Sequence, residues 1–255
     1  MRKAWLLAGV VSAAVMTSGC VIVVADEDGA KMNFAETRQG EFILLDRNGD
    51  YSRIGGDTNL RGRVGGDVSL LSGDVDMDDI TIGGELSIAA GDVNFTGRVD
   101  GDASIAGGDV TFDGFAGRDL SIAAGELMVR GTIEGDGSFA AANMHIDAEI
   151  HRELNAQADD MYVAGRVDDR IQLVAADEIR RRRSDDPSHG RIELDGEIAN
   201  GGEVCARTLI IGPQARINGT LLVWTEDAPR VDGSARVEDL RFTPREGRDC
   251  DRYVD

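Results

Sequence analysis

The chain has 255 residues, of which 33 are glycine and only 4 are proline, and its formal net charge is -20. Glycine is well above its usual share of about 7%, while the scarcity of proline excludes collagen and polyproline segments. A hydrophobic content of 42% argues against a wholly disordered chain. The strong acidity argues against nucleic acid as a partner, because contacts to phosphates need a basic surface.

Residues 1–19 have the pattern of a secretory signal peptide. Arg2 and Lys3 precede an apolar run over residues 4–15, which is too short for a membrane-spanning helix of about 20 residues. The run ends in Thr-Ser-Gly-Cys, which resembles the lipobox of bacterial lipoproteins. The resemblance implies cleavage before Cys20 and acylation of Cys20. The alternative is an ordinary cleaved signal peptide followed by an incidental cysteine.

Lipidation of Cys20 would make the membrane a partner of this chain. Three acyl chains exceed the two signals needed for stable anchoring. Residue 21 is Val rather than Asp, and in the lipoprotein sorting pattern this implies the periplasmic face of the outer membrane. Removal of Arg2 and Lys3 with the signal peptide changes the net charge to -22. We expect residues 20–50 to form the lipid anchor, a tether and an N-terminal cap.

A 17-residue repeat runs through most of the chain. The stretches between residues 83 and 150 share an apolar pair, a corner with Gly, Asp or Asn, and a second apolar pair. The step from Val68 to Leu86 is 18, so the early repeats are expected to vary by one position. Two sets of apolar positions recur in steps of 17, Leu86, Ala103, Leu120, Gly137, Leu154 and Ile171, and Val93, Val110, Leu127, Met144 and Met161.

Within each repeat, apolar and polar residues alternate over short runs, as in Leu-Ser-Ile at residues 86–88. A period of two indicates β-strands, and Gly, Asp and Asn between the runs supply turns. Three short strands per repeat predict one coil of a three-sided parallel β-helix, in which stacking buries a continuous core. We expect an all-β fold with a single parallel β-helix over residues 51–240, of about nine or ten coils. Residues 241–255 are expected to form a C-terminal tail or cap.

The repeat is interrupted once. The step from Met161 to Ile192 is 31, which is one step of 17 with an insertion of 14. A step of 17 is then expected from Val204 to Leu221. The inserted positions are centred on 178–190, where charge, proline and the lack of periodicity predict an inserted loop.

The inserted loop carries a strongly basic cluster. One interpretation is that the cluster binds phosphates of anionic lipid or an acidic envelope protein. The alternative is a solvated loop whose charge is neutralised by Asp185 and Asp186. The cluster consists of Arg180, Arg181, Arg182 and Arg183.

Two cysteines besides Cys20 remain after export. An oxidising compartment allows a disulfide between Cys205 and Cys250 to persist, and the alternative is two unpaired thiols. The outward position of the first strand carries serine in several coils, followed by Asn155, Gln172 and Cys205, which would leave Cys205 on an accessible face. We interpret this column as a solvated strand position, with a binding face as the alternative. The serines are Ser69, Ser87, Ser104, Ser121 and Ser138.

The 17-residue repeat and the stretch at residues 209–223 resemble bactofilins, a family of polymer-forming bacterial β-helix proteins. The resemblance covers about residues 50–240. It implies a right-handed β-helix, no enzymatic activity and assembly by stacking of coils. This chain departs from the family in its signal peptide, because bactofilins are typically cytoplasmic. The matching positions are Ile211, Gly212, Ala215, Ile217 and Gly219.

These patterns favour a non-enzymatic structural or scaffold lipoprotein of the cell envelope, without a cofactor or a metal. Its expected partners are the membrane, further copies of itself as a homo-oligomer or polymer, and an envelope protein or anionic lipid. The alternative is a β-helix enzyme or binding protein that acts on envelope polysaccharide or lipid. Most Asp residues stand beside Gly at corners, where a turn role suffices. His145, His151 and His189 share no zinc-ligand spacing with Cys or acidic residues.

Overall fold

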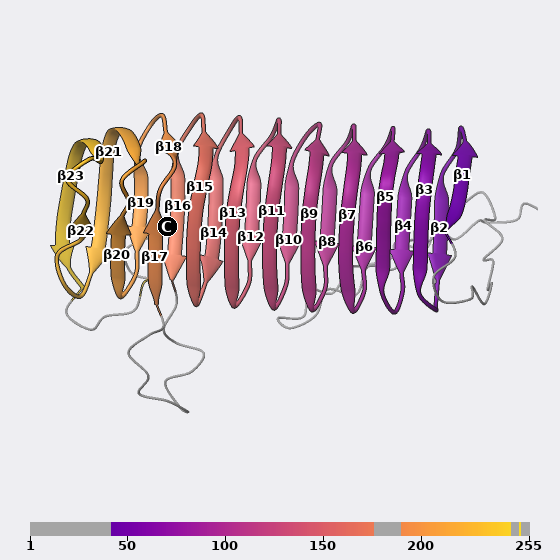
Figure 1. Ribbon diagram of the computed structural model, residues 1–255, viewed down its shortest axis with the longest axis horizontal. Coiled ribbons are helices and arrows are strands. Elements are labelled where there is room, and N and C mark those ends of the chain that lie inside the picture. The colour runs from indigo at the N-terminus through magenta and orange to yellow at the C-terminus, as the bar shows by residue number, and fades with distance from the viewer. Residues whose placement is uncertain (1–41, 176–189, 246–249, 251–255) are drawn as a thin grey trace, which may run out of the picture.

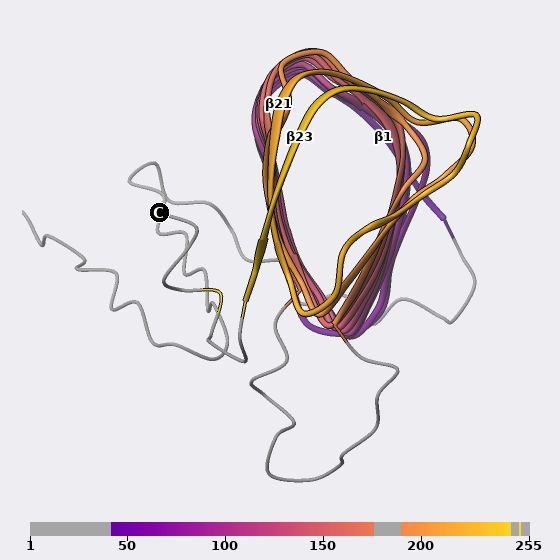
Figure 2. The ribbon, with the colours of Figure 1, turned by 90° about the vertical axis from the view of Figure 1, so that its left-hand side faces the viewer.

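The computed structural model describes residues 42–175, 190–245 and 250. These residues form an all-β parallel solenoid of about 11 turns with coils of ~17 residues (Figure 1), which confirms the predicted fold. Viewed along the axis, the coils superpose into a three-cornered outline (Figure 2). The solenoid begins at Ile43 rather than at residue 51, so it has more coils than expected.

Up to Ala175, each coil has a long strand and a short strand. The second and third of the predicted strands are continuous in the long strand. The long strands are β1 (Ile43–Arg47), β3 (Thr58–Val64), β5 (Val75–Ile82), β7 (Asp92–Val99), β9 (Asp109–Ala116), β11 (Glu126–Ile133), β13 (Asn143–Ile150) and β15 (Asp160–Val167). The short strands are β2 (Tyr51–Ile54), β4 (Val68–Leu71), β6 (Leu86–Ala89), β8 (Ala103–Ala106), β10 (Leu120–Ala123), β12 (Gly137–Ala140), β14 (Leu154–Ala158) and β16 (Ile171–Ala175).

From Gly190 onward the coils are less regular. Strands there differ in length from 2 to 10 residues, and one strand continues around a corner that separates two strands in other coils. They are β17 (Arg191–Leu194), β18 (Glu197–Ile198), β19 (Gly202–Cys205), β20 (Thr208–Ile211), β21 (Arg216–Thr225), β22 (Arg230–Val231) and β23 (Arg236–Pro244).

Each strand pairs in parallel with the equivalent strand of the next coil. Leu120 pairs with Ala103 and Gly137, as the first set of 17-residue steps predicts. The second set is confirmed in the same way along β7 to β15. The longer early repeat has its extra residue in β5, where the register shifts and Asp79 has a positive φ of 51°. A β-bulge thus absorbs the additional residue.

The core consists of columns of inward-facing apolar side chains. Phe95 and Phe112 occupy equivalent positions in β7 and β9, and their rings stack with centroids 4.9 Å apart. Both are fully buried. Removal of each such aromatic side chain from water contributes about 1.5–3 kcal/mol before entropic costs. The core is continuous because each coil covers the apolar face of the coil before it.

The corners explain the glycine and aspartate content. Gly131 has φ of +104°, and a Cβ there would lie 1.9 Å from the carbonyl oxygen of Gly114 in the preceding coil. At a second corner, the Asp119 carboxylate accepts a hydrogen bond of 2.8 Å from the backbone N–H of Asp136, one coil later. Successive coils repeat this contact, so aspartate connects coils as well as forming turns. The corresponding acceptors are Asp50, Asp67, Asp102 and Asp136 at this corner and Asp57, Asp74 and Asp92 at another.

Two predicted register assignments in the C-terminal coils were wrong. Val204 pairs with Val223 rather than with Leu221, because two more residues separate Ile211 from Arg216 than separate the equivalent residues one coil earlier. Cys205 pairs with Val174, and Glu203 takes the place after Gln172 in the serine column. The interrupted coil makes the step 31 in every column that crosses it, whereas Cys205 lies 33 positions after Gln172.

The two ends of the solenoid expose part of the core. Ile43, Leu45 and Tyr51 are partly buried at the first coil, as are Leu240 and Phe242 at the last. Within the described residues, β1 pairs with β3 alone and β23 pairs with β21 alone. No helix in the described part of the chain is long and apolar enough to cross a membrane.

Candidate functional site

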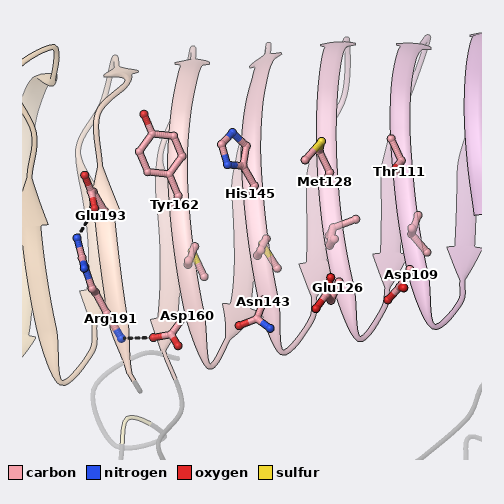
Figure 3. A pocket seen from close by; sticks show the side chains of 14 residues that line it. Asp109, Thr111, Glu126, Met128, Asn143, His145, Asp160, Tyr162, Arg191 and Glu193 are labelled. Carbon is pink, nitrogen blue, oxygen red and sulfur yellow. Dashed lines mark hydrogen bonds and ion pairs between the residues drawn. The ribbon is translucent and has the colours of Figure 1, made fainter. Parts of the chain in front are cut away.

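A groove of about 580 Å³ runs across the long strands of several consecutive coils (Figure 3). Its first row of side chains occupies the outward position between two buried residues of each strand, as Thr111 does between Val110 and Phe112. The strict alternation of the β-strand fixes this orientation. The register places the row in line along the solenoid, one residue per coil, and its members are Thr111 (β9), Met128 (β11), His145 (β13), Tyr162 (β15) and Glu193 (β17).

A second row lies where the same strands begin, beside the corner. It is polar throughout, and it forms one side of the groove in Figure 3. Four of its side chains carry charges and the fifth is an amide. The row consists of Asp109, Glu126, Asn143, Asp160 and Arg191.

The first row presents two rings side by side. The centroids of His145 and Tyr162 lie 4.8 Å apart with an interplanar angle of 34°, and Met128 continues the row on the other side of His145 (Figure 3). All three side chains are half-buried. The groove therefore offers a flat, partly apolar floor in an otherwise acidic surface.

Arg191 organises the C-terminal end of the groove. Its guanidinium donates to the carboxylate of Glu193, and its backbone N–H donates to the Asp160 carboxylate at 3.1 Å. These contacts engage one member of each row and join β17 to β15. The carboxylates of Asp160 and Glu193 are thus already partnered.

The environment of Tyr162 is unfavourable for phenolate. The pKa of Tyr162 is raised above its ordinary value of 10.0, first by burial and then by the negative charges of Asp195, Glu193 and Asp147. Both causes disfavour a negative phenolate oxygen. Tyr162 is consequently a neutral hydrogen-bonding group in this groove over the physiological pH range.

Several polar side chains in the groove have no partner. Within the described residues, no hydrogen bond or ion pair engages the side chains of Thr111, Glu126 and Asn143, and His145 has only its ring contact with Tyr162. These groups include donors and acceptors. They are available to a molecule that binds across the coils.

A second groove of about 700 Å³ lies on the short-strand face of the later coils. The serine column leads into it, since Ser138 pairs with Asn155 and Asn155 with Gln172. Its polar groups are more fully paired, because Arg170 donates to Glu153 at 2.6 Å and both Thr220 and Arg241 donate to Asp239 at 2.9 Å. The first groove thus has more groups free to bind.

Cys205 and Cys250 form a disulfide with Cα atoms 5.6 Å apart. Cys205 is fully buried, in contrast to the accessible position expected from the serine column. Arg245 is buried beside the bond and donates to the sulfur of Cys250 and to Glu226. The disulfide and the contacts of Arg245 hold Cys250 against β19.

Other predicted positions fall elsewhere. Cys20 and the four arginines Arg180, Arg181, Arg182 and Arg183 lie outside the described residues. His151 is on the surface and contacts Glu134 at 3.1 Å. Among the described residues, no group of His, Cys, Asp and Glu is arranged to hold a metal ion.

Sequence reasoning missed the groove. It considered His145 only as a candidate zinc ligand, although one step of 17 separates His145 from Tyr162 and places both in one column. The signal that could have revealed the groove is the column of outward residues next to the second set of apolar positions. Met128 lies in that column one coil before His145. Reading that column as well as the serine column would have placed the rings side by side.

Comparison of the chain with known proteins finds no matching family model, no matching curated protein and no matching solved structure.

Proposed function

We propose that this chain is a non-enzymatic structural lipoprotein of a bacterial cell envelope, in which the solenoid serves as a rigid spacer or scaffold. The observation that supports the proposal is the stack of coils from Ile43 to Pro244, to which nearly all described residues belong. About 11 turns at about 4.8 Å each correspond to a rod of about 50 Å. Such a rod suits a role in holding partners at a fixed separation.

The lipobox-like sequence at Cys20 supplies the anchor in this proposal. Acyl chains on Cys20 hold the N-terminus in the membrane, most simply at the periplasmic face of the outer membrane. The charge of -22 on the remaining chain opposes contact between the rod and anionic lipid headgroups. The rod would then stand away from the membrane surface at the end of its tether.

Assembly through the ends is the bactofilin-like part of the proposal. The outer edges of β1 and β23 have no strand partner within the described residues, and unpaired edges are templates for pairing with another chain. Half-buried Tyr51 at one end and Phe242 at the other offer apolar surface. Head-to-tail contact of this kind is heterologous and produces open filaments.

Membrane fractionation tests the anchor. In the source cell, the wild-type chain is expected in the membrane fraction and labelled by radioactive palmitate. The C20S variant is expected to lose both the label and the membrane association. C250S, which removes a cysteine far from the lipobox, is the matched control and should keep both the label and the membrane association. An unlabelled wild-type chain would contradict lipidation.

Sedimentation and negative-stain microscopy over a range of concentrations test assembly. Wild-type protein is expected to form rods in multiples of about 50 Å. Phe242→Asp places a charge at the exposed end of the core and should shorten them, whereas Ser104→Asp on the lateral face should not. Strict monomers at every concentration would remove the polymer and leave the single-rod spacer.

A further inference from the structure

We propose that the groove across β9, β11, β13, β15 and β17 binds a linear, uncharged polysaccharide whose chain lies along the solenoid axis. The occupant meets one outward side chain and one corner side chain from each coil. This function goes beyond that of a spacer and does not depend on lipidation or assembly. Its support comes from the shape of the groove, its free polar groups and its charge.

The groove is linear and periodic. Its two rows cross four consecutive long strands and the shorter strand β17 at equivalent positions, so neighbouring side chains of one row are separated by one coil step of about 4.8 Å. A unit of an extended glycan has a comparable length. Five coils therefore span about 20 Å and accommodate about four sugar units.

The chemistry of the two rows matches both surfaces of a sugar. His145 and Tyr162 present adjacent rings, which suit the C–H faces of pyranose units. Thr111, Glu126 and Asn143 are free of hydrogen-bond partners within the described residues, and together they can donate to and accept from hydroxyl groups. A floor of rings beside a row of polar and charged side chains fits a polyhydroxylated ring better than it fits a lipid chain.

The strands that line the groove argue against an extended peptide. Each of them pairs on both sides, as β13 does with β11 and β15, so no backbone edge is open for an added strand. Peptides that bind by strand addition rely on that edge. A glycan needs side chains alone, and the groove supplies them.

The charge of the groove selects against anionic chains. Glu126 and Asp109 line it, and Asp147 and Asp195 act on Tyr162 at its edge. The positive charge of Arg191 is already matched by Glu193. Uronic-acid polymers and phosphate-bearing glycans would meet repulsion. Uncharged glycans meet none.

Titration calorimetry with the purified C20S chain tests the proposal without interference from lipid. The probes are oligomers, from dimer to hexamer, of β-1,4-linked glucose, β-1,4-linked N-acetylglucosamine and α-1,4-linked glucose. We expect at least one series to bind, with affinity that rises with length and levels off near about four units. Oligomers of galacturonic acid, which carry a charge on each unit, should not bind.

Variants locate the site. Tyr162→Ala is expected to weaken binding at least about ten-fold, whereas Tyr162→Phe, which keeps the ring, should bind within about three-fold of wild type. Asn155→Ala in the second groove is the matched control and should change nothing. Because Tyr162 and Asn155 are both half-exposed, melting temperatures should stay close to wild type and verify the fold.

Three results would overturn the proposal. One is the absence of binding by all three uncharged series, and another is equal or tighter binding of the galacturonic acid series or of a lysine-rich peptide. The third is binding that survives Tyr162→Ala but fails in Asn155→Ala. Each of these leaves the lipidation and assembly measurements unaffected, so the two proposals fail separately.

Discussion

The coils between Leu86 and Ala175 and those between Arg191 and Pro244 share a fold but differ in regularity. Two residues that pair with each other within the first region are always 17 positions apart. In the second, the separations are 17 between Ile192 and Leu209, 19 between Val204 and Val223 and 20 between Ile211 and Val231. The same architecture therefore tolerates variable coil length when the extra residues lie at corners.

The two regions are also held together differently. The regular coils repeat the same contacts, such as the close approach at Gly131 and the hydrogen bond from Asp136 to Asp119. The C-terminal coils instead use contacts that occur once, above all the disulfide and the buried Arg245. The stability of the regular coils is therefore spread over many small, repeated interactions. The stability of the C-terminal coils depends more on a few larger interactions.

The largest expected effect comes from a substitution at a repeated corner. Gly131→Ala adds a Cβ at a positive φ and within 1.9 Å of the Gly114 carbonyl oxygen, and we expect a loss of about 3–4 kcal/mol in unfolding free energy. Urea denaturation measures it. Gly233→Ala in the C-terminal coils is the control, since a Cβ there meets no atom within 4 Å. Equal loss in both variants would contradict the close-approach explanation.

Removal of the disulfide should destabilise the second region selectively. Cys205 and Cys250 are 45 residues apart, and a bridge over such a loop is worth about 2–4 kcal/mol. For C250S we expect faster hydrogen exchange in β19, β21 and β23, with exchange in β6 to β12 unchanged. Uniform acceleration along the whole solenoid would show that the two regions unfold as a single unit.

A single aspartate contact should have a smaller effect. Asp119→Ala removes the acceptor for the Asp136 N–H and is expected to cost about 1 kcal/mol. Asp113→Ala is the matched control, because the exposed Asp113 side chain has no hydrogen-bond partner within the described residues. Thermal unfolding of both variants gives the comparison. A control as unstable as Asp119→Ala would assign the effect to charge rather than to the hydrogen bond.

The smallest effect is confined to alkaline solution. Tyr162 belongs to the last regular coil, and its pKa is raised by burial and by acidic residues that include Asp195 and Glu193 of the C-terminal region. The folded state holds the phenol proton more tightly than the unfolded state, so this contribution is complete below about pH 10 and is lost as pH rises further.

Wild type should therefore lose slightly more stability above about pH 10 than Tyr162→Phe does. The phenolate absorbance that distinguishes the two proteins should titrate above the ordinary value of 10.0. A midpoint below that value would contradict the described environment of Tyr162.

The sequence was sufficient for the fold wherever apolar residues repeat. Leu120 and Leu127 belong to columns that burial constrains in every coil, so their partners could be counted in steps of 17. Val204 and Cys205 were misplaced because corner insertions change the count without changing the buried pattern. The groove was missed because outward positions such as Met128 and His145 face solvent, where packing imposes no common residue type.

The aspartate corners have a direction. In each contact the side-chain acceptor belongs to the earlier coil and the backbone donor to the later one, as Asp102 accepts from Asp119 and Asp119 from Asp136. A folded coil therefore presents aspartate carboxylates that can accept hydrogen bonds from the backbone of the coil that follows it. The solenoid can therefore grow coil by coil from its N-terminal end, with each new coil ordered by the one before it.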